Sequence, residues 1–258
     1  MAFTGEIDRA RCATLARMRA LVLSDIHANI VALDAVLAAA PPVDEVWHLG
    51  DVVGYGPDPD AVVDRLRKLG AYGVRGNHDA AAAGGDEIEA FNTDARRAME
   101  WTRTAIGGST RAWLDGLPEK LVRGDWTLVH GSPRDPIWEY ILSTSVVRAA
   151  FSDLETPHGL HGHTHLPVGY VEEDGAIDEV SPGSGSVLEL RPGQRALLNP
   201  GSVGQPRDGI PTTSWAVLDT GAGTMTWHRT AYDIAAVQAS MEALNLPGRL
   251  VERLAFGL

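Results

Sequence analysis

The sequence contains a single cysteine, no long apolar run and fewer basic than acidic residues, and each shortage excludes a class of protein. Cys12 cannot form an internal disulfide alone, which favours a reducing compartment such as the cytoplasm. No apolar run approaches the roughly 18 residues of a membrane span, and the N-terminus shows no signal-peptide hydrophobic block. The 22 basic and 34 acidic residues give a formal net charge of -12, which opposes binding to duplex nucleic acid. We therefore expect a cytoplasmic protein that binds neither membranes nor duplex nucleic acid.

The length of 258 residues is sufficient for one large core. Residues 1–17 carry arginines that alternate with small residues ahead of Met18, and we expect them to be a flexible N-terminal extension. Residues 18–258 are expected to form a single domain.

The first part of the chain alternates predicted strands and helices, whereas the second part is mostly short strands. The expected strands of the first part are Leu21–Leu23, Glu45–Leu49 and Ala71–Val74, with helices that start after Asn29 and at Asp58-Pro59. A helix over Asp86–Ile106, a shorter helix capped by Ser109, and a hairpin of Lys120–Arg123 with Trp126–His130 follow. Beyond Gly159 the expected strands are Val168–Val171, Ser186–Leu190, Ala196–Asn199, Trp215–Leu218 and Thr224–His228, before a helical stretch over Ile234–Leu254 interrupted by Pro247. This order predicts two sheets packed face to face with helices outside.

Polar residues follow apolar runs at five places along the chain. The segments are Asp25-Ile26-His27, Gly50-Asp51, Gly76-Asn77-His78-Asp79, His130-Gly131 and Gly162-His163-Thr164-His165. Asp25 and His27 are two residues apart, so their side chains point the same way in an extended chain. A carboxylate and an imidazole at the buried end of a strand are well explained by a metal ion. The carboxyl ends of strands are also the usual ligand-binding edge of an open α/β sheet.

The ordered series D-x-H, GD, GNH-D/E, a lone H and GH-x-H resembles that of the calcineurin-like binuclear metallophosphoesterase superfamily. The turn Asn199–Val203 is similar to one in the small prokaryotic members, a branch near the diadenosine tetraphosphatases. The resemblance implies an α/β fold, a four-layer α-β-β-α sandwich of two mixed sheets. It also implies hydrolysis of a phosphoester by in-line attack of a hydroxide that bridges two metal ions.

The same resemblance assigns the metal ligands. One metal takes Asp25, His27 and His165, the other takes Asn77, His130 and His163, and Asp51 bridges both. Oxygen and imidazole ligands without a thiolate suit two divalent transition-metal ions, Mn²⁺ foremost, with Fe, Zn and Ni as alternatives. A closed structural metal site is the competing interpretation, and the absence of cysteine ligands disfavours it.

By resemblance, His78 is the acid that protonates the leaving oxygen or the residue that stabilises the pentavalent phosphorus. Asp79 is its candidate orienting partner, although an Asp at this position can equally cap the next turn.

Four further residues are candidates for substrate binding. Arg75 and Arg207 are the cations best placed for a substrate phosphate, and Asn29 is either a helix cap or a substrate contact. Tyr55, with Trp138 and Tyr140, offers a stacking surface for a nucleoside unless these rings pack within the fold.

Two departures from the wider superfamily bear on the substrate. Protein Ser/Thr phosphatases carry GD-x-V-D-R-G, whereas Gly50–Gly56 reads GDVVGYG and lacks that Asp and Arg. The arginine that follows the GNH motif in those enzymes is replaced by Ala80–Ala83. We therefore expect a small phosphodiester or nucleotide-type phosphoester as substrate. The alternatives are a phosphomonoesterase or phosphoprotein phosphatase and, more remotely, a non-catalytic scaffold with the same fold.

Overall fold

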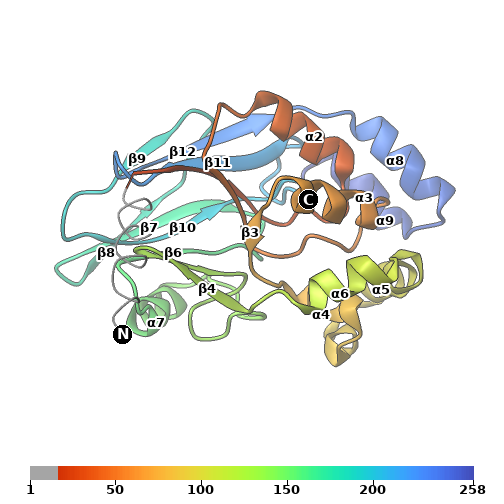
Figure 1. Ribbon diagram of the computed structural model, residues 1–258, viewed down its shortest axis with the longest axis horizontal. Coiled ribbons are helices and arrows are strands. Elements are labelled where there is room, and N and C mark those ends of the chain that lie inside the picture. Colours follow the sequence, from red (N-terminus) through yellow and green to blue (C-terminus); the bar gives the residue numbers. More distant parts are fainter. Residues whose placement is uncertain (1–16) are drawn as a thin grey trace, which may run out of the picture.

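The computed structural model describes residues 17–258, apart from the side chain of Glu87, and contains two six-stranded sheets (Figure 1). The predicted extension over residues 1–17 lies outside the described residues, except for Arg17. The strands of the first sheet are, in spatial order, β3 (Tyr72–Gly73), β2 (Glu45–His48), β1 (Arg19–Leu23), β11 (Thr213–Asp219), β12 (Thr224–Thr230) and β9 (Val187–Glu189). Those of the second sheet are β4 (Lys120–Arg123), β5 (Trp126–Val129), β6 (His158–Leu160), β10 (Arg195–Pro200), β7 (Pro167–Glu173) and β8 (Ala176–Val180).

Both sheets are mixed. In the first sheet β1 runs parallel to β2 and antiparallel to β11, and in the second β10 runs parallel to β6 and antiparallel to β7. The crossover helices are α2 (Ile30–Ala39) and α3 (Pro59–Lys68). Asn29 starts α2 because its side-chain oxygen accepts a hydrogen bond from the Ala32 backbone N–H at 3.0 Å. The predicted strand–helix alternation of this part of the chain is therefore confirmed.

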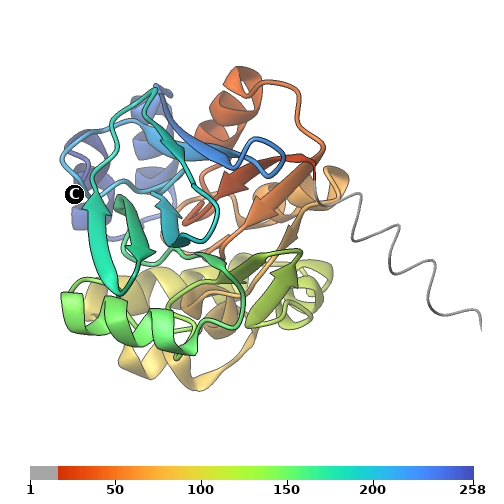
Figure 2. The same ribbon diagram turned by 90° about the vertical axis from the view of Figure 1, so that its left-hand side faces the viewer.

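Apolar side chains divide the molecule into four layers. Between the sheets lie Val22, Trp47, Leu128, Leu198 and Trp227, all buried. The opposite face of the first sheet, including Leu21 and Leu23, packs against α2 and α3 through Leu33, Val36 and Leu66. The opposite face of the second sheet, including Leu197, packs against α7 (Thr144–Asp153) through Val147 and Phe151. Figure 2 shows α2 and α7 on opposite sides of the two sheets. The predicted α-β-β-α sandwich is confirmed.

The structure corrects several predicted elements. The single helix expected over Asp86–Ile106 is a 3₁₀ helix η1 (Asp86–Ala90) followed by α5 (Thr93–Ala105), because Asn92 caps a new start by accepting from the Ala95 N–H at 3.0 Å. The shorter helix, α6 (Gly108–Asp115), begins one residue ahead of the predicted Ser109 cap. The sequence analysis did not predict α7, β6 or β8; β6 and β8 are short strands of the second sheet, and α7 packs against that sheet.

The remaining helices gather at one end of the sandwich (Figure 1). They comprise α4 (Asn77–Ala83), η1, α5, α6, α8 (Ile234–Ala243), α9 (Gly248–Glu252) and the 3₁₀ helix η2 (Arg253–Ala255). Ala98 of α5 packs with Val237 of α8 and Leu250 of α9, which joins the C-terminal segment to the middle of the chain. No helix within residues 17–258 is both long enough and apolar enough to cross a membrane.

Candidate metal centre

The predicted motif residues follow the carboxyl ends of the strands, most of them in loops and Asn77, His78 and Asp79 in the first turn of α4. Five of them adopt positive φ angles, namely Asp25 (51°), His27 (48°), Asp51 (50°), His163 (65°) and His165 (61°). This conformation costs a non-glycine residue roughly 1–3 kcal/mol, and it persists where surrounding contacts fix the backbone. Here the Asp25 and His27 N–H groups donate to the carbonyls of Gly50 and Asp51 at 3.1 and 2.9 Å. Asp25 and His27 therefore meet through a tight loop, and not through the extended chain expected from their spacing.

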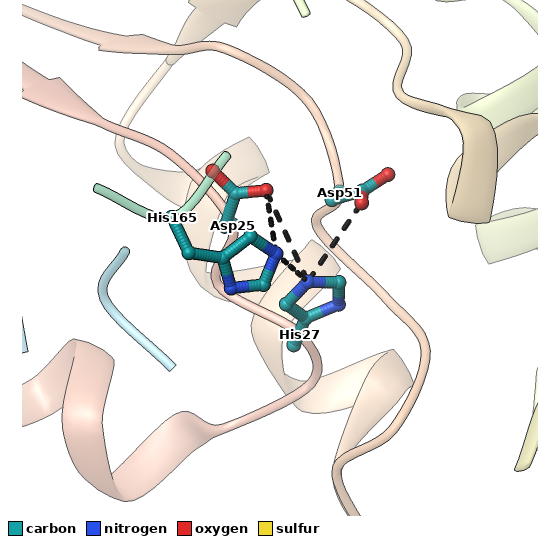
Figure 3. A group of neighbouring side chains, drawn as sticks. All are labelled: Asp25, His27, Asp51 and His165. Atoms are coloured by element: carbon teal, nitrogen blue, oxygen red, sulfur yellow. Dashed lines mark hydrogen bonds and ion pairs between the residues drawn. The ribbon is translucent and has the colours of Figure 1, made fainter. Parts of the chain in front are cut away.

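Four side chains form the first half of the cluster (Figure 3). Asp25, His27, Asp51 and His165 are all buried, and their ligand atoms lie within 4.8 Å of one another. His165 Nε2 lies 3.2 Å from both Asp25 Oδ1 and His27 Nε2. His27 Nε2 lies 3.7 Å from Asp51 Oδ2. Three segments far apart in the sequence thus bring two carboxylates and two imidazoles to one point.

The second half of the cluster shares Asp51 with the first. Asp51, His130 and His163 place ligand atoms within 4.8 Å of one another. His130 Nε2 lies 3.3 Å from Asp51 Oδ2 and 3.0 Å from His163 Nδ1. Asn77 adds an amide oxygen 3.1 Å from the same Nε2 atom. The structure therefore brings together all seven predicted ligand residues, in the two predicted groups, with Asp51 between them.

Backbone carbonyls orient three of the four imidazoles. The Nδ1 atoms of His27, His130 and His165 lie 3.2, 2.8 and 2.6 Å from the carbonyl oxygens of Val53, Leu49 and Gln205. A carbonyl only accepts, so each Nδ1 carries the proton and, in the neutral ring, each Nε2 presents its lone pair to the cluster. Metal-bound histidines usually donate their other ring N–H to a backbone carbonyl or a carboxylate in this way.

The cluster fits divalent cations because its lone pairs face one another. Within residues 17–258 Asp25 Oδ1 is buried without a hydrogen-bond partner, beside the Nε2 atoms of two imidazoles. Burial raises the pKa of Asp25 to about 7 and lowers the pKa of His165 well below its usual value. Burial also lowers the pKa of His130, but the Asp51 carboxylate more than offsets this and raises it to about 9. A carboxylate oxygen without a hydrogen-bond partner and a buried neutral imidazole therefore face each other here, and bound metal ions would satisfy both.

His78 and Asp79 begin helix α4 and differ in their surroundings. The His78 backbone N–H donates to Asp51 Oδ1 at 2.9 Å, and its ring packs between Tyr55 and Phe91, with centroids 4.3 and 4.5 Å away. Asp79 accepts from the backbone N–H groups of Gly76 and Val53 at 3.0 and 3.1 Å. Among the described contacts Asp79 does not bond to the His78 ring, so it ties two ligand loops together as a helix-capping residue.

A cavity of about 320 Å³ opens over the cluster. Two of the four predicted substrate-binding residues line this cavity, and the other two do not. Arg207 and Tyr55 line it, together with Phe91, Trp138 and Tyr140. The Tyr140 ring stacks on His163 with centroids 3.8 Å apart. Phe91 was not predicted, because no motif marks it.

Arg75 and Asn29 lie outside this lining. Arg75 pairs with Glu119 at 3.3 Å and with Asp115 at 3.8 Å, so its charge is directed toward those carboxylates. Asn29 caps α2, and its amide nitrogen donates to the Gly204 carbonyl at 3.2 Å. Asn29 was predicted to be either a helix cap or a substrate contact, and in the structure it is a helix cap.

Position 76 needs a glycine because the Asp51 side chain lies too close for a Cβ atom. A Cβ at Gly76 would lie 2.1 Å from Asp51 Oδ1. We expect Gly76→Ala to displace this carboxylate and to weaken metal binding roughly 10–100-fold, as lost support of a ligand commonly does. Metal titration followed by calorimetry measures the change. Gly108→Ala is the matched control, since a Cβ there meets nothing within 4 Å. Equal metal affinity in the two variants would contradict the prediction.

Comparison with known proteins agrees with this geometry. Residues 18–223 match the family model described as the calcineurin-like phosphoesterase superfamily domain. The chain belongs to that superfamily, and it is a phosphoesterase, a hydrolase of the metallophosphoesterase class.

Individual relatives extend the likeness over nearly the whole chain. A metallophosphoesterase from Sphaerobacter thermophilus is 44% identical, with a TM-score of 0.86, and the match covers 94% of this chain and 100% of that one. An uncharacterised protein of Methanocaldococcus jannaschii is 34% identical over 92% of this chain and 97% of its own length. A hypothetical protein from Pyrococcus horikoshii, at 22% identity, shares the fold with a TM-score of 0.73 over 93% of this chain and 98% of that one.

Proposed function

We propose that the protein hydrolyses a small phosphodiester or nucleotide-type phosphoester in the cytoplasm with two divalent transition-metal ions, Mn²⁺ foremost. The observation that carries this proposal is the pair of ligand groups that share Asp51. One ion would be held by Asp25, His27 and His165, and the other by Asn77, His130 and His163. When bound, such a pair polarises a phosphoryl group and lowers the pKa of water.

The residues around the cluster have separate roles in this proposal. Arg207 lines the cavity and would pair with the substrate phosphate. His78 lies against Tyr55 and Phe91 at the same cavity, where its ring would give a proton to the departing oxygen. Its backbone N–H already contacts Asp51, which fixes the start of α4 against the cluster.

The aromatic lining supports a small, flat leaving group. Tyr55, Phe91, Trp138 and Tyr140 line a cavity of about 320 Å³. That volume is suited to a small molecule, since ligand pockets commonly run from about 300 to 1,000 Å³. The proposed partner is therefore a small phosphoester, and neither duplex nucleic acid nor a membrane.

The alternative within the class is a phosphomonoesterase that acts on phosphoproteins. It is disfavoured because the segment Gly50–Gly56 lacks the Asp and Arg of the protein phosphatases. Arg75, the nearest arginine to the GNH motif, is paired with Glu119 and Asp115. A non-catalytic scaffold is disfavoured because all seven ligand positions and His78 are present.

A substrate panel tests the proposal. We expect kcat/KM for bis-p-nitrophenyl phosphate and for dinucleoside polyphosphates to exceed that for phosphopeptides by at least about tenfold, because the cavity fits a small ester. Each substrate is assayed with Mn²⁺, Fe²⁺, Zn²⁺ and Ni²⁺ at equal concentration, and p-nitrophenyl phosphate serves as the monoester reference. Phosphopeptides as the better substrates would support the phosphatase alternative. Hydrolysis of none of them with any metal would support the scaffold.

A further inference from the structure

The C-terminal segment, which follows the family-matched residues 18–223, places an arginine beside the metal centre. Arg253 is the first residue of η2, and its guanidinium carbon lies 4.8 Å from the centroid of the Tyr55 ring. The same Tyr55 ring contacts His27 and His78, with centroids 4.6 and 4.3 Å away. One aromatic ring thus separates Arg253 from a candidate metal ligand and from the candidate acid.

Tyr55 and Asn92 also form a wall between two hollows. They line both the cavity over the cluster and an adjoining hollow of about 650 Å³ that Arg253 lines. Arg207 lines the cavity on the cluster side. The hollow lined by Arg253 therefore adjoins the cavity over the cluster at Tyr55 and Asn92.

The charge of Arg253 is only partly compensated within the described chain, where the Asp94 carboxylate and the Tyr55 side chain raise the pKa of Arg253 against the larger lowering by burial. Its Nε and Nη2 atoms are buried without a hydrogen-bond partner, and no acidic group within residues 17–258 forms an ion pair with it. Asp94 and Glu252 line the same hollow without making that contact. In contrast, Arg229 is paired with Asp208 and Arg195 with Glu172. Arg253 is half-buried, and leaving two of its nitrogens unbonded carries a desolvation cost that a bound anion would reduce.

The two arginines also influence each other. Burial is the main cause that lowers the pKa of Arg253 to about 10, and the positive charge of Arg207 adds to it. Arg207 lines the cavity over the cluster and Arg253 lines the adjoining hollow, so both guanidinium groups place positive charge near the position where an anionic substrate would bind.

We propose that Arg253 and Arg207 form an anion subsite that holds a second, non-reacting phosphoryl group of the substrate. This inference rests on the proposed function and narrows it to esters that carry at least two phosphoryl groups. The competing explanation is that Arg253 only packs η2 against Tyr55. That role predicts a change in stability and no dependence on the number of phosphates in a ligand.

Calorimetric binding to the metal-loaded protein separates the two explanations without requiring turnover. The probes are AMP and adenosine 5′-(α,β-methylene)diphosphate, which differ by one phosphoryl group. We expect the wild-type protein to bind the diphosphate at least about tenfold more tightly, the worth of one charge-assisted contact. Arg253→Gln should remove most of that difference and change the affinity for AMP by less than about twofold. Arg253→Lys should retain part of it.

Control variants make the result specific. Arg249→Gln changes an exposed arginine of the same segment that lines the same hollow, and should leave the difference intact. Arg253→Met keeps a long unbranched side chain without the charge, and is used if Arg253→Gln does not fold. The proposal is overturned if the wild-type protein does not distinguish the probes. The proposal is also overturned if Arg253→Gln and Arg253→Met weaken the binding of both probes equally. It is likewise overturned if Arg249→Gln removes the difference in affinity between the probes. Binding without hydrolysis of any substrate would count against the proposed function alone.

Discussion

Asp51→Asn should remove metal from both halves of the cluster and abolish hydrolysis. Asp51 Oδ2 lies 3.7 Å from His27 Nε2 in one group and 3.3 Å from His130 Nε2 in the other, so a single carboxylate serves both. Asparagine keeps the size of the side chain but removes the negative charge that attracts two cations. We expect about two ions per chain in the wild-type protein, and a variant that retains neither at equal metal concentration.

The expected loss of activity exceeds about three orders of magnitude, because metal coordination lowers the pKa of water from 15.7 to about 7. Elemental analysis of dialysed protein and the rate on bis-p-nitrophenyl phosphate measure both effects. Asp44→Asn is the matched control, since Asp44 is exposed and accepts from the Arg19 N–H at the other end of β1. Retention of one full equivalent of metal by Asp51→Asn would show that this carboxylate belongs to only one site.

His78→Ala should slow hydrolysis strongly and leave metal content unchanged. The side chain projects from the first turn of α4 toward Tyr55 and Phe91, and its contact with Asp51 is made by the backbone N–H, which alanine retains. Removal of a positioned acid typically costs roughly two to four orders of magnitude in rate. Metal analysis and steady-state kinetics on the same preparation separate a ligand role from an acid role.

Leaving-group dependence gives the sharper test of His78. Alkoxides need a proton to depart, whereas nitrophenolate leaves readily as an anion. The deficit of His78→Ala should therefore be largest for alkyl esters and smallest for nitrophenyl esters. His158→Ala is the control, because this half-buried histidine packs against Trp126 in the second sheet. Loss of a metal ion from His78→Ala, or an equal deficit on both kinds of ester, would refute the acid role.

Much of the fold could be predicted because its signals are local. Asn29 at the start of α2 and Pro59 at the start of α3 act within one helical turn, so a single sequence records them. β6 and β8 are short strands of the second sheet with few apolar residues, so their local signal is weak. Two local helix caps were missed, Ser143 at the start of α7 and Asn92 at the start of α5.

The sequence by itself identified the family, and the resemblance predicted two groups of candidate metal ligands without a thiolate, because the family motifs occur in order along the chain. Only the tertiary structure decided how the cluster closes, with its Asp and His residues at positive φ and its imidazoles oriented by carbonyls. The tertiary structure also paired Arg75 with Glu119, and it brought Arg253 beside Tyr55, which lies nearly 200 residues earlier in the chain. Such contacts depend on packing between distant segments, which leaves no periodic or motif signal in the chain.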